Sequence, residues 1–234
     1  MKNLIVLMLP LFVMLTPARG SSAGEYVLDA DASEFVVRLY KAGIGAALAH
    51  NHVIEATDVQ GAVTWDPQAP ADASVSVQAD ARSLVADADP LREKYGLEKT
   101  LADDKRSEVQ STMESDEQMD VERYPEMSFE STRVTPVEDG SVEITGDLTL
   151  HGQTRQVSFR ATPEVEGETL RADAEIELLQ SDFGIEPYSS FLGAVKNEDR
   201  AKMVIHLIAT RSHEDTPETT KGEVPSGATP EDAE

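Results

Sequence analysis

Two histidines separated by one residue, His50 and His52, are the most distinctive candidates for chemistry in the sequence. If residues 46 to 56 form a strand, both side chains lie on one face, roughly 6 to 7 Å apart, because side chains two apart point the same way. The rest of that face is apolar: Leu48, Ile54 and Ala56. Such a pair can be hydrogen-bonded core or rim histidines, can recognise a quinone carbonyl or phosphate oxygen, or can hold a metal. The metal would need a third ligand, such as His151 or a carboxylate.

Other patterns with catalytic potential lack the context that their chemistry needs. The chain has no cysteine, which excludes thiol nucleophiles and thiolate metal sites. A G-x-S-x-G pattern at residues 20 to 24 lies beside an expected signal cleavage site, without a strand before it or a helix after it. Walker, Rossmann and HExxH patterns do not occur. We therefore expect no catalytic residue, no metal ligand and no cofactor. A metal-dependent or redox-assisting periplasmic enzyme that uses His50 and His52 is the alternative.

The charge of the chain argues against polyanionic partners. It carries 20 Lys and Arg against 44 Asp and Glu, a formal net charge of −24. A surface this acidic repels phosphate backbones and anionic headgroups. The sequence therefore disfavours nucleic-acid binding and electrostatic docking on an anionic membrane.

Both ends of the chain are expected to lie outside the folded domain. Residues 1–23 combine Lys2, an apolar run from Leu4 to Leu15 and small residues after it, a pattern typical of a secretory signal peptide. Residues 212–234 are acidic and have almost nothing to bury, which predicts a disordered tail. The folded domain is then 24–211, in a periplasmic or secreted product without stable membrane insertion.

The dominant period within the domain is two. Apolar and polar residues alternate from Val142 to Leu150 and from Ala172 to Leu178, with weaker alternation elsewhere, a pattern typical of half-buried antiparallel strands. Gly140, Gly152 and Gly167 mark turns between alternating runs, so consecutive strands form hairpins. The alternation predicts these inward side chains: Val142, Ile144, Leu148, Leu150, Phe159, Ile176 and Leu178, facing Phe35, Val37 and Phe129. Small inward residues, Ala79, Gly146, Ala161 and Ala174, leave room either for a channel or for ordinary packing.

A short helical insertion interrupts the strands. Asp89 and Pro90 form a helix start, followed by Leu91, Tyr95 and Leu97 at helical spacing. A second helix is predicted from Asp103, with Val109 and Met113 on one face. In a β-barrel these helices would cap the mouth or lie against the wall.

Four ordered motifs resemble the YceI-like lipid-binding family. They are the opening Tyr26–Asp29 with Ser33–Phe35, the stretch Val121–Ser131 around Tyr124-Pro125, the hairpin Gly146–Arg155, and Ser181–Ile185. The segment Lys41–Ile54 is longer and richer in histidine than the family pattern, so the ligand's headgroup can differ here.

The resemblance implies an all-β, eight-stranded antiparallel, lipocalin-like barrel around an apolar tunnel for a polyisoprenoid. We therefore predict an exported binding protein, not an enzyme, that holds a long-chain isoprenoid, polyprenyl or quinone-like, or another apolar lipid. The sequence leaves its oligomeric state open. The predicted ligand-binding residues are His50, His52, Phe35, Val37, Phe129, Leu148, Leu150, Phe159, Ile176 and Phe183.

Overall fold

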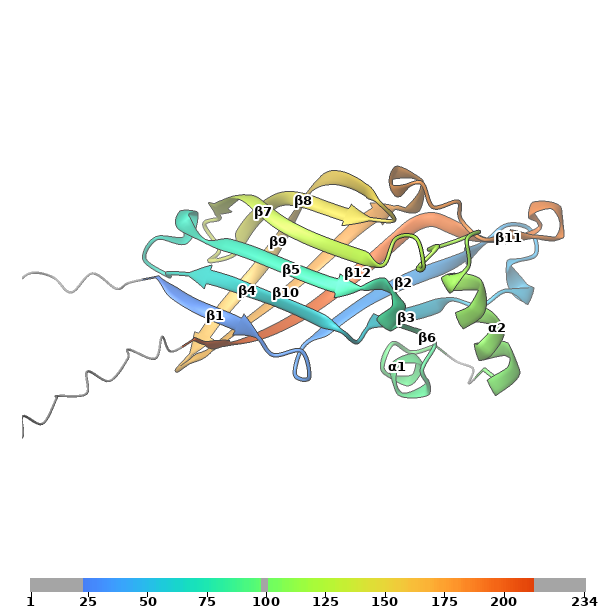
Figure 1. Ribbon diagram of the computed structural model, residues 1–234, viewed down its shortest axis with the longest axis horizontal. Coiled ribbons are helices and arrows are strands. Elements are labelled where there is room, and N and C mark those ends of the chain that lie inside the picture. Colours follow the sequence, from blue (N-terminus) through green and yellow to red (C-terminus); the bar gives the residue numbers. More distant parts are fainter. Residues whose placement is uncertain (1–22, 98–100, 213–234) are drawn as a thin grey trace, which may run out of the picture.

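Eight antiparallel strands close into a barrel in the computed structural model, which describes residues 23–97 and 101–212 (Figure 1). Around the ring the strands are β1 (Gly24–Leu28), β4 (Val59–Trp65), β5 (Ser74–Asp80), β7 (Glu126–Pro136), β8 (Val142–Leu150), β9 (Gln153–Glu166), β10 (Thr169–Leu179) and β12 (Val195–Arg211). The ring closes where Tyr26 and Leu28 of β1 pair with Arg211 and Ala209 of β12. The predicted fold class is confirmed.

The predicted hairpins join four consecutive strands of the ring, β7 to β10. The register of β8 on β9 runs from Leu150 opposite Gln153 to Val142 opposite Ala161. Both turn residues of this hairpin, His151 and Gly152, have positive φ angles, 49° and 68°. This is the turn geometry that matches the twist of two paired strands. The two-residue hairpin therefore sets the register that directs Val142, Ile144 and Leu148 inward.

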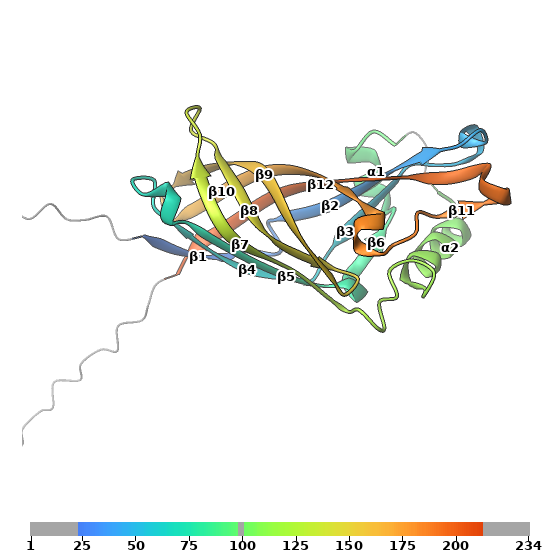
Figure 2. The ribbon, with the colours of Figure 1, turned by 90° about the horizontal axis from the view of Figure 1, so that it is seen from above.

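A second group of strands extends the sheet at one end of the barrel. β2 (Glu34–Ala42) pairs with the first part of β12, β3 (His52–Ala56) pairs with β2, and β6 (Leu84–Ala86) pairs with β3. The short β11 (Ser189–Ser190) pairs with the start of β12. Figures 1 and 2 show β11 and the two helices at this end, opposite the end where β1 begins and β12 finishes.

Both predicted helices are present, and both lie against the wall, one of the two places expected for them. Helix α1 (Asp89–Lys94) lies outside the wall, where Leu91 packs on the buried Val36 and Val53 of β2 and β3. Helix α2 (Asp103–Glu114) lies beside β6, and its Met113 and Val109 pack against Ile54 and Leu84. One helix covers the outer face of the added strands, and the other completes the wall beside the edge strand.

The two predicted terminal segments lie almost entirely outside the residues that the structure describes. Residues 1–22 and 213–234 lie outside the described part, so the signal peptide and the acidic tail stay predictions. Ser212, the first residue of the predicted tail, is described, and its backbone N–H donates to the carbonyl oxygen of Glu25 at 2.7 Å.

Candidate ligand cavity and its mouth

The barrel encloses a cavity of about 570 Å³. Its wall comes from the inward side chains of the ring strands, of β2 and β3, and of one face of α2. Ligand pockets usually measure about 300 to 1,000 Å³ and are mostly apolar. This cavity therefore has the size and the lining of a site for one apolar molecule.

Each residue predicted to bind the ligand lies on the wall of this cavity. The set spans six strands, the loop before β3 and the turn after β10: Phe35, Val37, His50, His52, Phe129, Leu148, Leu150, Phe159, Ile176 and Phe183. Val142, Ile144 and Leu178 line it as well, so the predicted inward faces are confirmed. Phe129 and Phe159 contact each other, with ring centroids 5.4 Å apart.

Small inward residues contribute unequally to the free space. Ala79, Ala161 and Ala174 line the cavity. Gly146 does not widen it, because a Cβ at this position would lie 2.5 Å from the ring of Phe129. The glycine makes room for the phenylalanine ring, and only the alanines leave space for a ligand.

The cavity reaches the surface at the end that carries α2 and β11. There the lining includes the exposed side chains of His50, Lys105, Glu108 and Lys196. Lining residues toward the other end, such as Trp65 and Leu170, are buried. The site is thus a deep apolar pocket with a polar mouth at one end.

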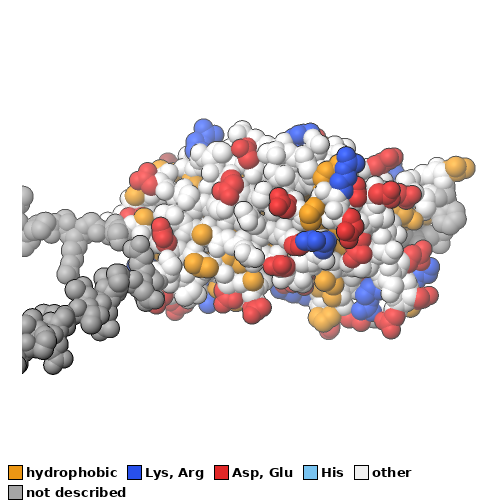
Figure 3. All heavy atoms as spheres, in the orientation of Figure 1, with side chains coloured by type: hydrophobic (Ala, Val, Ile, Leu, Met, Phe, Trp, Pro, Cys, Tyr) orange, Lys and Arg blue, Asp and Glu red, His pale blue; other side chains and the backbone are white. Residues whose placement is uncertain are grey.

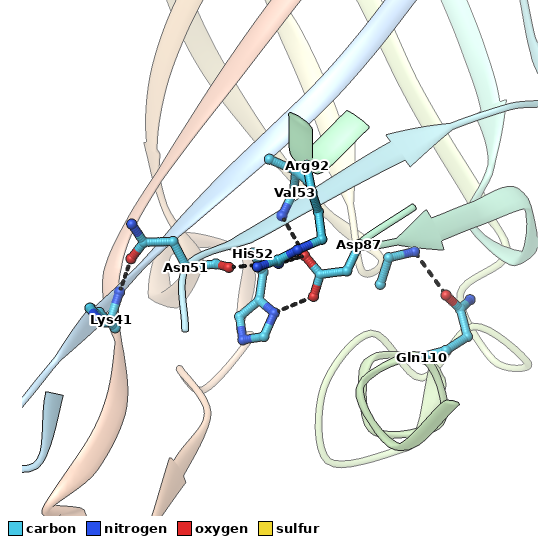
Figure 4. A network of polar contacts seen from close by, with 8 residues as sticks. Lys41, Asn51, His52, Val53, Asp87, Arg92 and Gln110 are labelled. Atoms are coloured by element: carbon cyan, nitrogen blue, oxygen red, sulfur yellow. Dashed lines mark hydrogen bonds and ion pairs between the residues drawn. The ribbon is translucent and has the colours of Figure 1, made fainter. Parts of the chain in front are cut away.

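His52 is a polar group at the mouth that is held in place by a buried carboxylate. Its Nδ1 lies 2.6 Å from Oδ2 of Asp87, and its side chain is 17% exposed. Since an ionised carboxylate only accepts hydrogen bonds, Nδ1 carries the ring proton and donates a hydrogen bond to Asp87. Nε2 lies on the far side of the ring and is an acceptor when the imidazole is neutral (Figure 4).

Asp87 is fully buried and holds several groups together. Its carboxylate also accepts from Nη1 of Arg92 at 2.7 Å and from the backbone N–H of Val53 at 3.2 Å. Burial alone would raise the pKa of Asp87, but the hydrogen bond and charge of His52, together with the Val53 N–H and Arg92, lower it overall. Asp87 therefore stays ionised and fixes the orientation of the His52 ring.

The sequence-based prediction missed Asp87 and Arg92. Asp87 follows a three-residue edge strand, and Arg92 lies on a helix of six residues. Neither residue belongs to a motif or to an alternating run. They meet His52 only because β6 pairs with β3, and nothing in the local pattern of so short a strand indicates that pairing.

The predicted strand over residues 46 to 56 is wrong in its first part. Strand β3 begins only at His52, and Ala46–Leu48 form one turn of 3-10 helix. Gly43, with φ of 88°, and Gly45 pack closely on the backbone of Ala194, and the Gly45 N–H donates to the Ala194 carbonyl oxygen at 2.8 Å. This contact curls the segment away from the sheet. His50 and His52 therefore both line the mouth, but they do not lie on one face of a strand.

Three of the motifs that suggested the family meet near this end of the barrel. The rings of Tyr124 and His151 stack edge to face, with centroids 4.5 Å apart. His151 Nδ1 lies 3.2 Å from the carbonyl oxygen of Phe183, whose side chain lines the cavity. A Cβ at Gly152 would lie 2.7 Å from the Tyr124 ring. These residues thus lock the β8–β9 hairpin onto the turn that carries Phe183. His151, which the sequence offered as a third metal ligand, has this structural contact instead.

Two further observations concern metals and membranes. Among residues 23–97 and 101–212, no three His, Asp or Glu side chains converge in a way that could hold a metal ion. In the same part of the chain, no helix is both long and apolar enough to cross a bilayer.

Comparison with known proteins agrees with this architecture. The YceI-like domain matches residues 26–209. UPF0312 proteins of Pseudomonas putida strains W619 and GB-1 are 30% and 29% identical over 183 residues, which are 76% of this chain and 84% of each relative. The crystal structure of BcnA from Burkholderia cenocepacia shares the fold, with a TM-score of 0.59 and 19% identity over 78% of this chain and 99% of that one. The chain belongs to the YceI-like domain family.

Proposed function

We propose that this protein is an exported carrier that holds one long-chain isoprenoid lipid, polyprenyl or quinone-like, in its barrel, and that it is not an enzyme. The observation that carries the proposal is the cavity of about 570 Å³, apolar along its depth and polar only at its mouth. A long apolar chain with one polar end fits this distribution, because burial of the chain is favourable and the head stays near water.

The volume sets the length of chain that the barrel can enclose. A water molecule takes roughly 30 Å³ of liquid volume, so the cavity has room for about twenty groups of that size. A methylene group is similar in size to a water molecule. A chain of about twenty carbons would be enclosed, and a longer one would extend through the mouth.

His52 is the group that we assign to the polar head. Asp87 fixes its ring at the mouth of the cavity and leaves Nε2 available to a ligand. In its neutral form Nε2 would accept a hydrogen bond from a hydroxyl head, and in its protonated form it would donate to a carbonyl or phosphate oxygen. His50 lines the same mouth and is the second candidate for head contact.

The contacts of His52 support binding rather than catalysis. Its Nδ1 is occupied by Asp87, and in the described part of the chain no serine or threonine hydroxyl hydrogen-bonds to the ring. A histidine and aspartate without a hydroxyl nucleophile in reach can orient a ligand, but they lack the third group that the triad chemistry of hydrolases requires.

The test is extraction of the purified protein with organic solvent, followed by mass spectrometry and metal analysis. We expect about one long-chain isoprenoid per protein. Ala174→Phe, which fills the cavity wall, should lose this lipid, whereas Ala62→Phe, a matched change at an exposed position, should retain it. Stoichiometric metal without lipid would contradict the proposal and favour the enzyme alternative.

The proposed location outside the cytoplasm has its own test. Cell fractionation should recover a processed protein, shortened at its N-terminus, in the periplasm or the medium. Recovery of the uncleaved chain in the cytoplasm would contradict export.

A further inference from the structure

Two loops beside the cavity mouth form a projection that we call the tip, residues 43–50 and 188–194. The loop between β2 and β3 packs on the loop between β11 and β12, since the Gly45 N–H donates to the Ala194 carbonyl oxygen and Gly43 approaches the same residue. Ala49, His50 and Tyr188 belong to the tip and also line the cavity. The tip is therefore continuous with the opening through which a ligand would pass.

The tip exposes two large apolar side chains. Ile44 is 98% exposed and Leu192 is fully exposed, and neither lines the cavity. Leu192 has φ of 56° and ψ of 37°, a left-handed backbone that is unfavourable for a residue with a branched apolar side chain. Figure 3 shows an apolar side chain protruding at the far right, beyond the charged surface of the barrel body.

The charge of the tip differs from that of the rest of the chain. The 15 residues of the tip, 43–50 and 188–194, contain no Asp, Glu, Lys or Arg, and Lys41 and Lys196 lie two residues beyond its ends. At the chain's overall frequency of 44 acidic residues in 234, these 15 residues would carry about three. A surface without carboxylates can approach lipid phosphates without repulsion, and the neighbouring Lys41 and Lys196 match the charge of the phosphates. Carboxylates resume at Glu186 and Glu198, and α2 carries Asp103, Asp104, Glu108 and Glu114 as well as Lys105 and Arg106.

We propose that the tip docks reversibly on a lipid bilayer, with Ile44 and Leu192 inserted among the lipids and Lys41 and Lys196 against lipid phosphates, so that the cavity mouth faces the membrane. The purpose of this contact rests on the proposed carrier function, because it gives an apolar ligand a route that avoids water. The contact itself rests on the exposed side chains and on the local charge alone.

The strongly acidic body determines which membranes the tip prefers. At low salt the net charge of −24 repels an anionic bilayer even though the tip does not. In 1 M salt the Debye length falls to about 3 Å, and this repulsion is screened. Docking should therefore be stronger on neutral phosphatidylcholine vesicles than on phosphatidylglycerol vesicles at low salt, and the difference should narrow as salt is added. A basic docking surface would show the opposite salt dependence.

The decisive experiment is flotation of the full-length mature protein with phosphatidylcholine vesicles. The double variant Ile44→Ser, Leu192→Asn removes both apolar side chains, and asparagine suits the left-handed backbone at position 192. We expect its vesicle affinity to fall at least ten-fold, because each inserted aliphatic side chain contributes at least that factor when fully buried. Val165→Ser is the matched control, since Val165 is 41% exposed and lies near the end of β9, away from the mouth.

Each outcome bears on one of the two proposals. If the wild type does not float, or if the double variant floats as well as the wild type, membrane docking is wrong. If the wild type instead forms a concentration-dependent dimer that the double variant loses, the tip is a contact between two copies of this chain, which also overturns the inference.

Lipid extraction from the double variant is a separate measurement. Because Ile44 and Leu192 do not line the cavity, its bound lipid should match that of the wild type, and an absence of lipid in both proteins would contradict only the carrier function.

Discussion

At the scale of single residues, Asp87 is the group on which the polar part of the mouth depends. It pairs with Arg92, orients His52 and bonds to the backbone of Val53, all without exposure to solvent. Arg92 is itself only 3% exposed and also donates to the carbonyl oxygen of Asn51. Loss of the carboxylate would remove a charged, hydrogen-bonded partner from the buried guanidinium, which is far more costly than loss of an exposed ion pair.

Asp87→Asn should lower the free energy of unfolding by about 3 to 5 kcal/mol, the usual cost of breaking one partner from a buried pair. Asparagine tolerates the left-handed backbone of this position, φ of 55°, so the loss reports on charge and hydrogen bonding rather than on strain. Chemical denaturation at neutral pH measures it. Asp173→Asn is the control, because the Asp173 side chain is exposed and bonds to the exposed His206. Equal stability of the two variants would contradict the role of Asp87.

The same residue predicts part of the acid sensitivity. The pKa of Asp87 is lowered in the folded protein, so its contribution to stability is complete above the unfolded pKa of about 3.9 and is lost as the pH falls through the lower, folded value. The free energy of unfolding of the wild type should therefore decline below about pH 4 more steeply than that of Asp87→Asn. Parallel curves would show that Asp87 titrates alike in both states.

His52→Gln should reduce the bound lipid while the stability of the fold is nearly unchanged. Glutamine retains a donor that can reach toward Asp87, but it does not present an Nε2 acceptor at the same place. Lipid content by mass spectrometry and the melting temperature should be measured together. His206→Gln is the matched control, since His206 also bonds to an aspartate but is half exposed on the outside of the barrel. A loss of stability without loss of lipid would make His52 a structural residue only.

At the scale of elements, helix α2 covers the unpaired edge of the short strand β6. β6 pairs with β3 on one side, and its other edge would present unpaired backbone groups. The side-chain oxygen of Gln110 on α2 accepts from the Ala86 N–H at 2.8 Å (Figure 4). Its Nε2 donates to the Leu84 carbonyl oxygen at 2.7 Å. One amide side chain thus replaces a neighbouring strand and fixes the helix beside the mouth.

Gln110→Ala should lower the free energy of unfolding by about 1 to 3 kcal/mol, because two backbone groups of β6 lose their partner and each such hydrogen bond contributes about 0.5 to 1.5 kcal/mol. Amide hydrogen exchange at Ala86 should accelerate, which locates the effect at the strand edge. Ser111→Ala, a change at the next and exposed position of the helix, should have little effect on either measurement. Unchanged exchange at Ala86 in Gln110→Ala would contradict the edge role.

Local sequence patterns predicted the strands correctly where apolar and polar residues alternate regularly and a short turn follows. Alternation placed Ile144 and Leu148 inside, and the turn at His151 and Gly152 set the register of their strand. The strand prediction was wrong for the segment before His52, since the conformation of this segment depends on the contact of Gly45 with Ala194, nearly 150 residues away. Asp87 was missed for the same reason. A sequence shows the period of a strand, but it does not show which distant backbone or charge will lie against a loop.

At the scale of the whole molecule, the protein has two kinds of apolar interior. The cluster of Val36, Val53 and Leu91 under α1 lies outside the cavity and packs side chain against side chain. The barrel interior is different, because residues such as Leu150 and Phe159 are only partly buried and face open space. The first interior stabilises the fold by itself, whereas the second gains its full packing only when a ligand fills it.

This difference predicts that two leucine truncations will respond differently to the ligand. Leu91→Ala creates a void in a packed cluster and should cost about 2 to 5 kcal/mol whether or not lipid is bound. Leu150→Ala enlarges a space that is already open, so it should cost less than Leu91→Ala in delipidated protein. In loaded protein Leu150→Ala should cost more than it does without lipid, because weaker binding reduces the stabilisation that a ligand gives the folded state, about 2.7 kcal/mol at a hundred times the dissociation constant. Chemical denaturation of both variants, before and after reloading with the extracted lipid, measures all four values. If Leu150→Ala costs the same with and without lipid, the ligand does not contact this part of the wall, and a barrel interior filled by its ligand would be the wrong description of the molecule.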